Sequence, residues 1–162
     1  MDPEQKIQEV ERKITTLDSS FRILEERMNT HSHTSSDLTR ALVTNRYLVL
    51  RLHASATAAA TGNGIGGDYV MPISGSITEV GVTVDTAGTT GTLTVDINKN
   101  ATTILSTKIT VDSGEKTSRT AAALPVISST TFTTGDIFTF DIDAIHTTPS
   151  SGLTVFMNIK QV

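Results

Sequence analysis

The chain has 162 residues, with 13 Lys or Arg, 17 Asp or Glu, and a formal net charge of −4. This acidic balance, with scattered basic residues, gives no attraction to nucleic acid or to an anionic membrane. The absence of cysteine excludes disulfides, thiolate nucleophiles and Cys-ligated metals. No stretch approaches 18 consecutive apolar residues, so no membrane insertion is expected, and the charged N-terminus lacks the apolar run of a signal peptide.

Composition divides the chain into two architectures joined by a neck. Residues 1–30 mix charged residues with regularly spaced aliphatics and predict a helix, whereas residues 46–162 are rich in Thr, Ser, Gly, Val and Ile, which favour strands. Residues 31–45 form the neck. The expected fold is therefore mainly β, with an N-terminal trimeric coiled coil followed by an antiparallel, jelly-roll-like β-sandwich.

A heptad repeat of apolar residues runs without a slip through the N-terminal segment. Its a and d positions carry Ile7, Val10, Ile14, Leu17, Phe21, Leu24 and Met28. This 3.5-residue repeat predicts a partner helix running alongside. The g positions carry Lys6, Lys13 and Arg27, and the e positions carry Glu11, Asp18 and Glu25. Opposite charges thus border the seam on both sides, which favours a parallel homo-oligomer.

The alternative is a single amphipathic helix folded onto the β domain. Such a helix normally has a wider apolar stripe that includes e or g positions, which here are charged or polar. Phe21 and Met28 at a positions fit a dimer poorly, and the segments that begin at Lys6 and Lys13 resemble the Arg-h-x-x-h-Glu signature of trimers. Three strands are therefore the favoured state.

Two histidines follow the helix directly, in a segment whose Ser and Thr residues favour an extended backbone. Residues two apart on an extended chain face the same side, so His31 and His33 would point together toward a threefold axis. Three chains would supply six imidazoles for one transition-metal ion, iron or nickel, while zinc prefers four tetrahedral ligands. The alternative is a pair of solvated or inter-chain hydrogen-bonded histidines without metal. A short helix is predicted from Asp37 to Leu42.

A His-x-His pair at a trimer axis resembles the metal-binding repeats in the tail fibres of T-even phages. The longer segment, residues 31–39, is similar to a Thr-His-x-His-x-x-Ser-Asp-Ile/Leu-Thr segment of tailed-phage fibre and structural proteins. The resemblance covers about ten residues. It implies a virion component with one ion per trimer, because this chain has a single His-x-His.

Short apolar runs separated by turn residues fill the rest of the chain. Strands are predicted at residues 47–52, 68–71, 76–84, 92–98, 103–111, 121–127, 137–142 and 153–159. The expected core includes Leu93, Val95, Ile97, Phe140, Val155 and Met157. From Gly67 to Ile159 the chain also resembles a β-sandwich domain of phage structural proteins, in segments such as those at residues 70–82 and 135–145.

Two short motifs resemble sites of known chemistry. Residues 96–100 superficially suggest a calcium loop but lack its glycine and distal glutamate, so a hairpin at Lys99 and Asn100 is expected. Asp141, Asp143 and His146 could form an acid–base group, yet the two aspartates alternate with apolar residues as on the outer face of a strand. No enzyme is expected.

The function expected from these patterns is that of a tailed-phage fibre or spike protein, made in the host cytoplasm and displayed on the virion surface. Its partners would be its own copies, other virion proteins and a host-surface glycan or protein. One alternative is a decoration protein that stabilises the capsid or tail. Another is a glycan-degrading enzyme, which is disfavoured because aromatic content is only 4% with no Trp.

Overall fold

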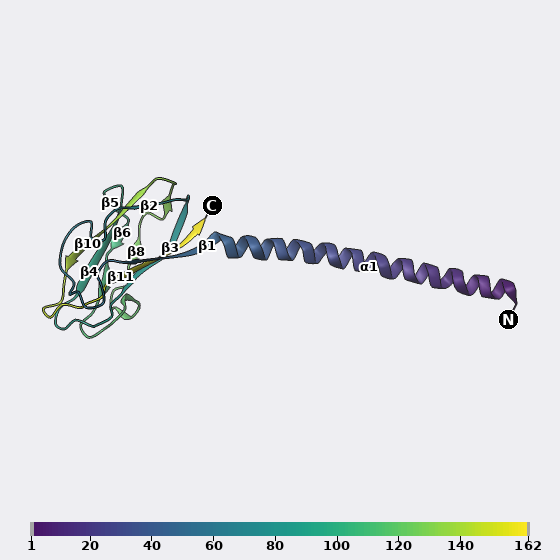
Figure 1. The fold of residues 1–162 in the computed structure, drawn as a ribbon, viewed down its shortest axis with the longest axis horizontal. Coiled ribbons are helices and arrows are strands. Elements are labelled where there is room, and N and C mark those ends of the chain that lie inside the picture. Colours follow the sequence, from purple (N-terminus) through teal and green to yellow (C-terminus); the bar gives the residue numbers. More distant parts are fainter. Residues whose placement is uncertain (1, 162) are drawn as a thin grey trace. The chain divides into compact units, whose positions relative to one another are not determined.

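The computed structural model describes the backbone of residues 2–161, and the side chains within residues 28–44 lie outside the described part. The chain divides into two compact units, Met1–Val43 and Thr44–Val162. The first consists of one helix, and the second is built from antiparallel strands, so the protein is mainly β as expected (Figure 1).

Helix α1 spans Pro3–Thr44, 42 residues, or about 63 Å at 1.5 Å per residue. The carbonyl of Asp2, at the N-cap, accepts the first helical hydrogen bond from the amide of Lys6 at 3.2 Å. The side chain of Gln5 also accepts from the amide of Asp2 at 3.4 Å. Pro3 stands in the first turn, where its missing N–H costs nothing.

The prediction that the helix ends near residue 30 is wrong. The backbone of α1 continues through the expected extended neck and includes the short helix predicted from Asp37 to Leu42. No glycine or proline occurs between Pro3 and Gly62, so nothing in the neck breaks a helix. In the same heptad register Leu38 stands at a d position and Leu42 at an a position, but His31 at d and Ser35 at a interrupt the apolar repeat after Met28.

The first sheet has four strands in the order β1-β11-β3-β9, all paired antiparallel. Their bounds are Asn45–Arg51 for β1, Thr154–Gln161 for β11, Gly75–Thr83 for β3 and Thr131–Phe132 for β9. Along β1, Leu48 and Leu50 pack against the core while Tyr47 and Val49 lie on the opposite, outer face. In the described part of the chain β1 pairs only with β11, so it forms an edge of this sheet.

The second sheet has the order β2-β10-β4-β5, with β7 also paired to β4. Its strands are Tyr69–Val70 (β2), Ile137–Ala144 (β10), Leu93–Lys99 (β4), Thr102–Thr103 (β5) and Ile109–Val111 (β7). A separate pair joins β6, Leu105–Thr107, to β8, Val126–Ile127, and a 3-10 turn, η1, spans Ser118–Thr120.

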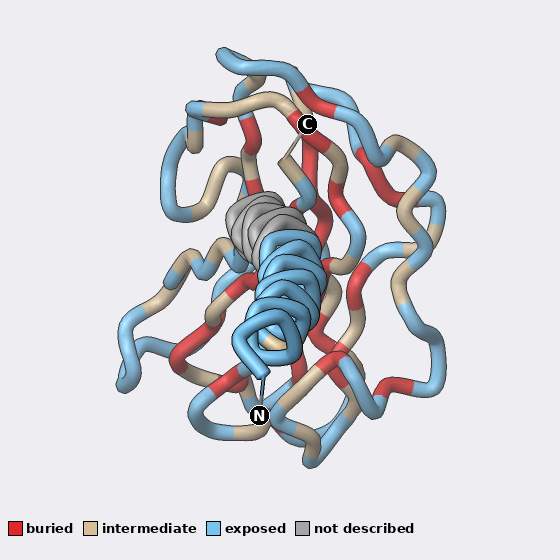
Figure 2. The backbone as a smooth tube through the Cα atoms, turned by 90° about the vertical axis from the view of Figure 1, so that its right-hand side faces the viewer, coloured by how far each residue is buried: buried red, intermediate tan, exposed pale blue. Residues whose placement is uncertain are grey.

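One hydrophobic cluster draws side chains from both large sheets. Figure 2 shows the buried segments, in red, distributed through the strand-rich unit, whereas the described part of the helix is almost entirely exposed. The predicted core residues are confirmed, since all six are almost completely buried: Leu93, Val95, Ile97, Phe140, Val155 and Met157. Phe132 of β9 meets Phe138 of β10 edge to face, with ring centroids 6.1 Å apart, and so links the two sheets. This shared core accounts for the stability of the β unit without disulfides.

Two of the expected strands are shorter or more broken than predicted. The run at residues 103–111 is divided into β5, β6 and β7, because the hydroxyl of Thr103 accepts from the amide of Leu105 at 3.1 Å and interrupts the ladder. The run at residues 121–127 contributes only β8, after η1. The short strand β9 was not predicted.

The predicted hairpin at Lys99 and Asn100 is confirmed. Lys99 pairs with Thr102, and the two residues between them, Asn100 and Ala101, have φ values of 50° and 64°. Two positive φ values characterise the type I′ turn, whose twist matches that of the flanking strands. The side chain of Asn100 donates to Asp136 at 2.8 Å and accepts from the amide of Ile137 at 2.9 Å, which ties the turn to β10.

Candidate functional site

The apolar seam of α1 is the most extensive solvent-facing hydrophobic feature among the described side chains. Six of its seven predicted members are between 55% and 69% exposed in the single chain: Ile7, Val10, Ile14, Leu17, Phe21 and Leu24. The seventh, Met28, lies outside the described side chains. A contiguous exposed stripe of this length marks an interaction surface.

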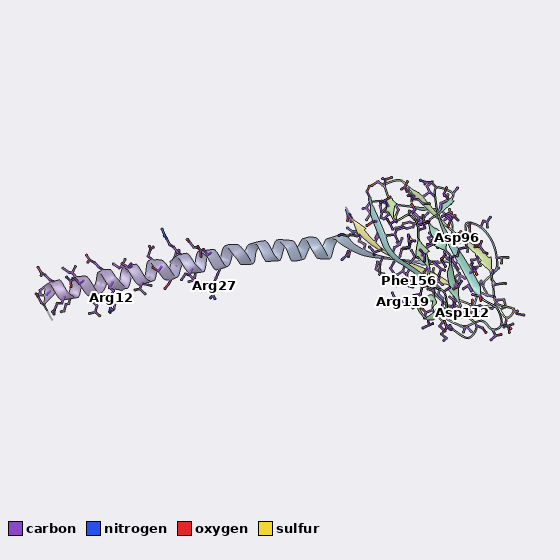
Figure 3. The ribbon with its side chains drawn as sticks, turned by 180° about the vertical axis from the view of Figure 1, so that it is seen from behind. Arg12, Arg27, Asp96, Asp112, Arg119 and Phe156 are labelled. Carbon is purple, nitrogen blue, oxygen red and sulfur yellow. The ribbon has the colours of Figure 1, made fainter. Side chains whose placement is uncertain are left out.

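The polar residues of α1 make contacts within the helix. The hydroxyls of Thr15, Thr16, Ser19 and Ser20 each donate to the carbonyl four residues earlier, at 2.9 to 3.0 Å. Lys13 contacts Glu9 at 3.1 Å one turn earlier. Arg12 and Arg27 extend away from the helix axis (Figure 3). These contacts leave the apolar stripe exposed.

The side chains of His31 and His33 lie outside the described residues, so the metal site stays a prediction. The extended backbone on which it depended is replaced by helix. Positions two apart on an α-helix lie about 200° apart around the axis, so they do not share a face. Among the side chains that the structure describes, no cluster of three or more His, Cys, Asp or Glu is arranged to hold a metal ion.

An aromatic cluster occupies the outer face of the first sheet. Phe156 of β11 lies beside Tyr47 of β1, with ring centroids 5.8 Å apart, and the guanidinium of Arg119 stands 5.1 Å from the Phe156 centroid (Figure 3). Gly81 of β3 is the register partner of Phe156, and a Cβ there would collide with the ring. Glycine at this position is therefore what allows the phenyl ring to lie flat on the sheet.

A groove of about 340 Å³ adjoins this cluster. Its apolar wall consists of Val80, Leu124, Pro125 and Ile127. Its polar side is internally paired: Arg119 contacts Glu79 at 2.6 Å, and Glu79 also accepts from the side-chain amide of Asn158 at 2.5 Å. The groove thus offers an apolar surface whose nearest charges already have partners.

A charged network lies on the second sheet around Lys108. Its ammonium contacts Asp143 at 2.7 Å and Asp96 at 3.0 Å, and the Asp96 side chain is only 7% exposed. Asp96 also accepts from the hydroxyl of Thr103 at 2.6 Å and from the amide of Ile97 at 2.8 Å. Hydrogen bonds to Asp143 and then to Asp96 raise the pKa of Lys108 above its ordinary value.

The structure does not join Asp141, Asp143 and His146 by hydrogen bonds. Asp141 accepts from the amide of Gly64 at 2.8 Å and from the side chain of Asn98 at 2.7 Å, while Asp143 contacts Lys108. His146 is 1% exposed, and neither ring nitrogen has a protein hydrogen-bond partner. The backbone of the glycine-rich loop at residues 62–67 thus holds Asp141 in place, through the amide of Gly64.

No protein-family model matches the chain, and the search of curated proteins found no significant match. In the part of the chain that the structure describes, no helix combines the length and apolar character required to cross a membrane.

Sequence reasoning identified the seam but missed the aromatic cluster, the groove and the Lys108 network. All three depend on strand register, which brings together residues far apart in the chain. A usable signal for the network was Asp96, a carboxylate between the apolar residues Val95 and Ile97. Charges are almost never fully buried without a partner.

We predict that Lys108→Met lowers the free energy of unfolding on the order of 1 kcal/mol at pH 8, because Asp96 and Asp143 lose the ammonium that they contact. The raised pKa means that this contribution is complete below about pH 10.4, the lysine value in unfolded chains. The contribution is lost as pH rises through the higher folded-state pKa. Chemical denaturation of both proteins between pH 8 and 11.5 measures the difference.

The difference between the two proteins should shrink at the alkaline end of the series. Lys116→Met is the matched control for general charge loss, and its effect should be smaller at pH 8. A constant difference from pH 8 to 11.5 would show that Lys108 stabilises the fold through its methylene chain and not through its charge.

Proposed function

We propose that this chain is a homotrimeric, non-enzymatic fibre or spike protein of a tailed-phage virion. In this proposal α1 forms a parallel three-stranded coiled coil, and the strand-rich unit is an antiparallel sandwich of the jelly-roll kind that serves host-surface recognition. The observation that carries the proposal is the exposed apolar seam of α1, because a heptad seam bordered by opposite charges favours packing against parallel copies of the same helix.

Energetics supports assembly through the seam more than through its charged borders. Removing each half-exposed aliphatic or phenyl side chain from water contributes about 1 to 2 kcal/mol. An exposed ion pair at the e and g positions contributes about 0 to 1 kcal/mol. The apolar contacts therefore drive association, while the charges favour the parallel register. The bulk of Phe21 and Met28 at a positions favours three strands over two.

We predict that Ile14→Asp converts the trimer to monomers at micromolar concentration. Three carboxylates would meet in an apolar layer, at a cost of at least about 4 kcal/mol per trimer, on the order of a thousandfold in the assembly constant. Sedimentation equilibrium measures the mass of each species.

Ile23→Asp is the matched control. Ile23 lies on the same helix at a c position and is exposed to 57%, against 60% for Ile14, so the same substitution there should leave the trimer intact. A wild-type chain that sediments as a monomer, or equal effects of the two substitutions, would contradict assembly through the predicted seam.

The virion assignment is supported by the resemblance of residues 31–39 and 67–159 to tailed-phage structural proteins. A coiled-coil stalk that carries a strand-rich unit is a common way of presenting a binding surface in several copies, and multivalency strengthens weak contacts. In the proposed arrangement, loops of the strand-rich unit contact a glycan or protein of the host surface, and no chemistry is required.

We expect antibodies against residues 46–162 to label purified particles in electron micrographs. We also expect an excess of the trimer to inhibit adsorption of those particles to host cells, because both compete for one receptor. Labelling without inhibition would favour the decoration role. Reducing sugar released from host envelopes would instead indicate a glycan-degrading enzyme, and absence of the protein from particles would remove the virion assignment.

The metal site that we propose would be formed by all three chains of the trimer. Six imidazoles from His31 and His33 of three chains can surround one ion only if the helical backbone there unwinds. We therefore predict that nickel or iron binds one ion per three chains with a loss of helical circular dichroism. Binding should weaken below about pH 6.5, since the ligand is neutral imidazole.

The double substitution His31→Ala with His33→Ala should abolish metal binding while the strand signal remains unchanged. Elemental analysis of protein purified without a His-tag gives the stoichiometry. Well under one metal per three chains, after incubation with either ion, would mean that these histidines are solvated or hydrogen-bonded between chains.

A further inference from the structure

We propose that the outer face of the first sheet forms a second interface of the trimer, in which Tyr47 and Val49 of one chain pack into the groove beside Leu124 of the next. This inference rests on the proposed parallel trimer of α1. It goes beyond that trimer in assigning the strand-rich unit an interface of its own.

Chain connectivity indicates that the occupant is a second copy. Helix α1 ends at Thr44 and β1 begins at Asn45, with no linker residue between them. Packed helices lie about 8 to 10 Å apart, so a parallel trimer brings three copies of Asn45 within on the order of 10 Å. Tyr47 follows two residues later, about 7 Å along the strand. The side chains that begin the strand-rich unit are therefore near their counterparts.

Strand β1 exposes two large apolar side chains, Tyr47 and Val49, to solvent in the single chain. Tyr47 is 58% and Val49 is 52% exposed, and both lie on the outer face of an edge strand. Exposed apolar side chains that lie together mark a contact surface, and this pair is flanked in sequence by the exposed Arg46 and Arg51. No charge lies between the two side chains in sequence, because Leu48 separates them and faces the core.

Threefold closure requires two different surfaces on each chain, one for each neighbour. The groove supplies the second surface, since Leu124 on its wall is 59% exposed. Strand β11 separates β1 from β3, whose residues Thr78, Glu79 and Val80 line the groove. The two surfaces are thus about 10 Å apart on one sheet. Side-by-side surfaces of this kind can contact two different neighbours around an axis.

The charges of the groove favour an apolar occupant. Arg119 is held by Glu79 and by the face of Phe156, and Glu79 is also bonded to Asn158. An ionic ligand would have to compete with these contacts. An aromatic ring and a valine can instead cover the apolar wall while the charge pair stays intact, and buried interface cores are typically depleted of unpaired charge.

The test places cysteines at the two surfaces of the full chain, which contains no native cysteine. The variant carries Val49→Cys and Leu124→Cys together, and is treated either with an oxidant or with a short bis-maleimide. We expect covalent trimers on a denaturing, non-reducing gel, because each chain would be joined to both of its neighbours. The pair Val49→Cys with Val70→Cys is the matched control, since Val70 is equally exposed on the second sheet.

The outcomes separate this inference from the proposed function. The second interface is overturned if the untreated double variant sediments as a trimer but, after treatment, gives only monomers or internally linked chains. The same holds if it crosslinks no better than the control pair. In both cases the proposed coiled coil stands. If the wild-type chain sediments as a monomer, the proposed trimer fails first. Covalent trimers at a yield well above the control pair support both.

Discussion

Apolar surface has to leave water, and the two units of this chain meet that constraint in different ways. The strand-rich unit buries its aliphatic and phenyl side chains within one chain, where two antiparallel sheets contribute to one core. Helix α1 keeps its seam exposed along the described part of its length. A helix gains most of its stability from packing and little from propensity. The properties we propose for this protein follow from that difference.

Local periodicity in the sequence was sufficient for most of the strand-rich unit. The alternation of Leu93, Val95 and Ile97 identified both a strand and its buried face, because successive side chains point to opposite sides of a sheet. The a and d spacing identified the stripe on α1 in the same manner. Both patterns involve residues only two to four positions apart, so they can be recognised from the sequence alone.

Local periodicity does not predict features that depend on competition between helix and extended backbone, or on the register between strands. The neck contains many Ser and Thr residues, which favour extended structure only weakly, and without glycine or proline the helix continues through it. The contacts of Lys108 with Asp96 and Asp143 join three strands or loops whose pairing the sequence does not specify. The packing of Phe156 with Tyr47 and Arg119 likewise depends on Gly81, whose missing Cβ leaves room for the phenyl ring.

The direct passage from Thr44 of α1 to Asn45 of β1 has a mechanical consequence. A load applied between the helix and Thr154, where β11 begins, pulls the two strands from opposite ends of their pairing, because Thr154 lies opposite Arg51. Because β1 and β11 are antiparallel and in continuous register from Asn45 to Arg51, their hydrogen bonds share that load and do not open one after another. Tension on a stalk would thus meet the strand in shear, the direction in which a ladder of hydrogen bonds resists force most strongly.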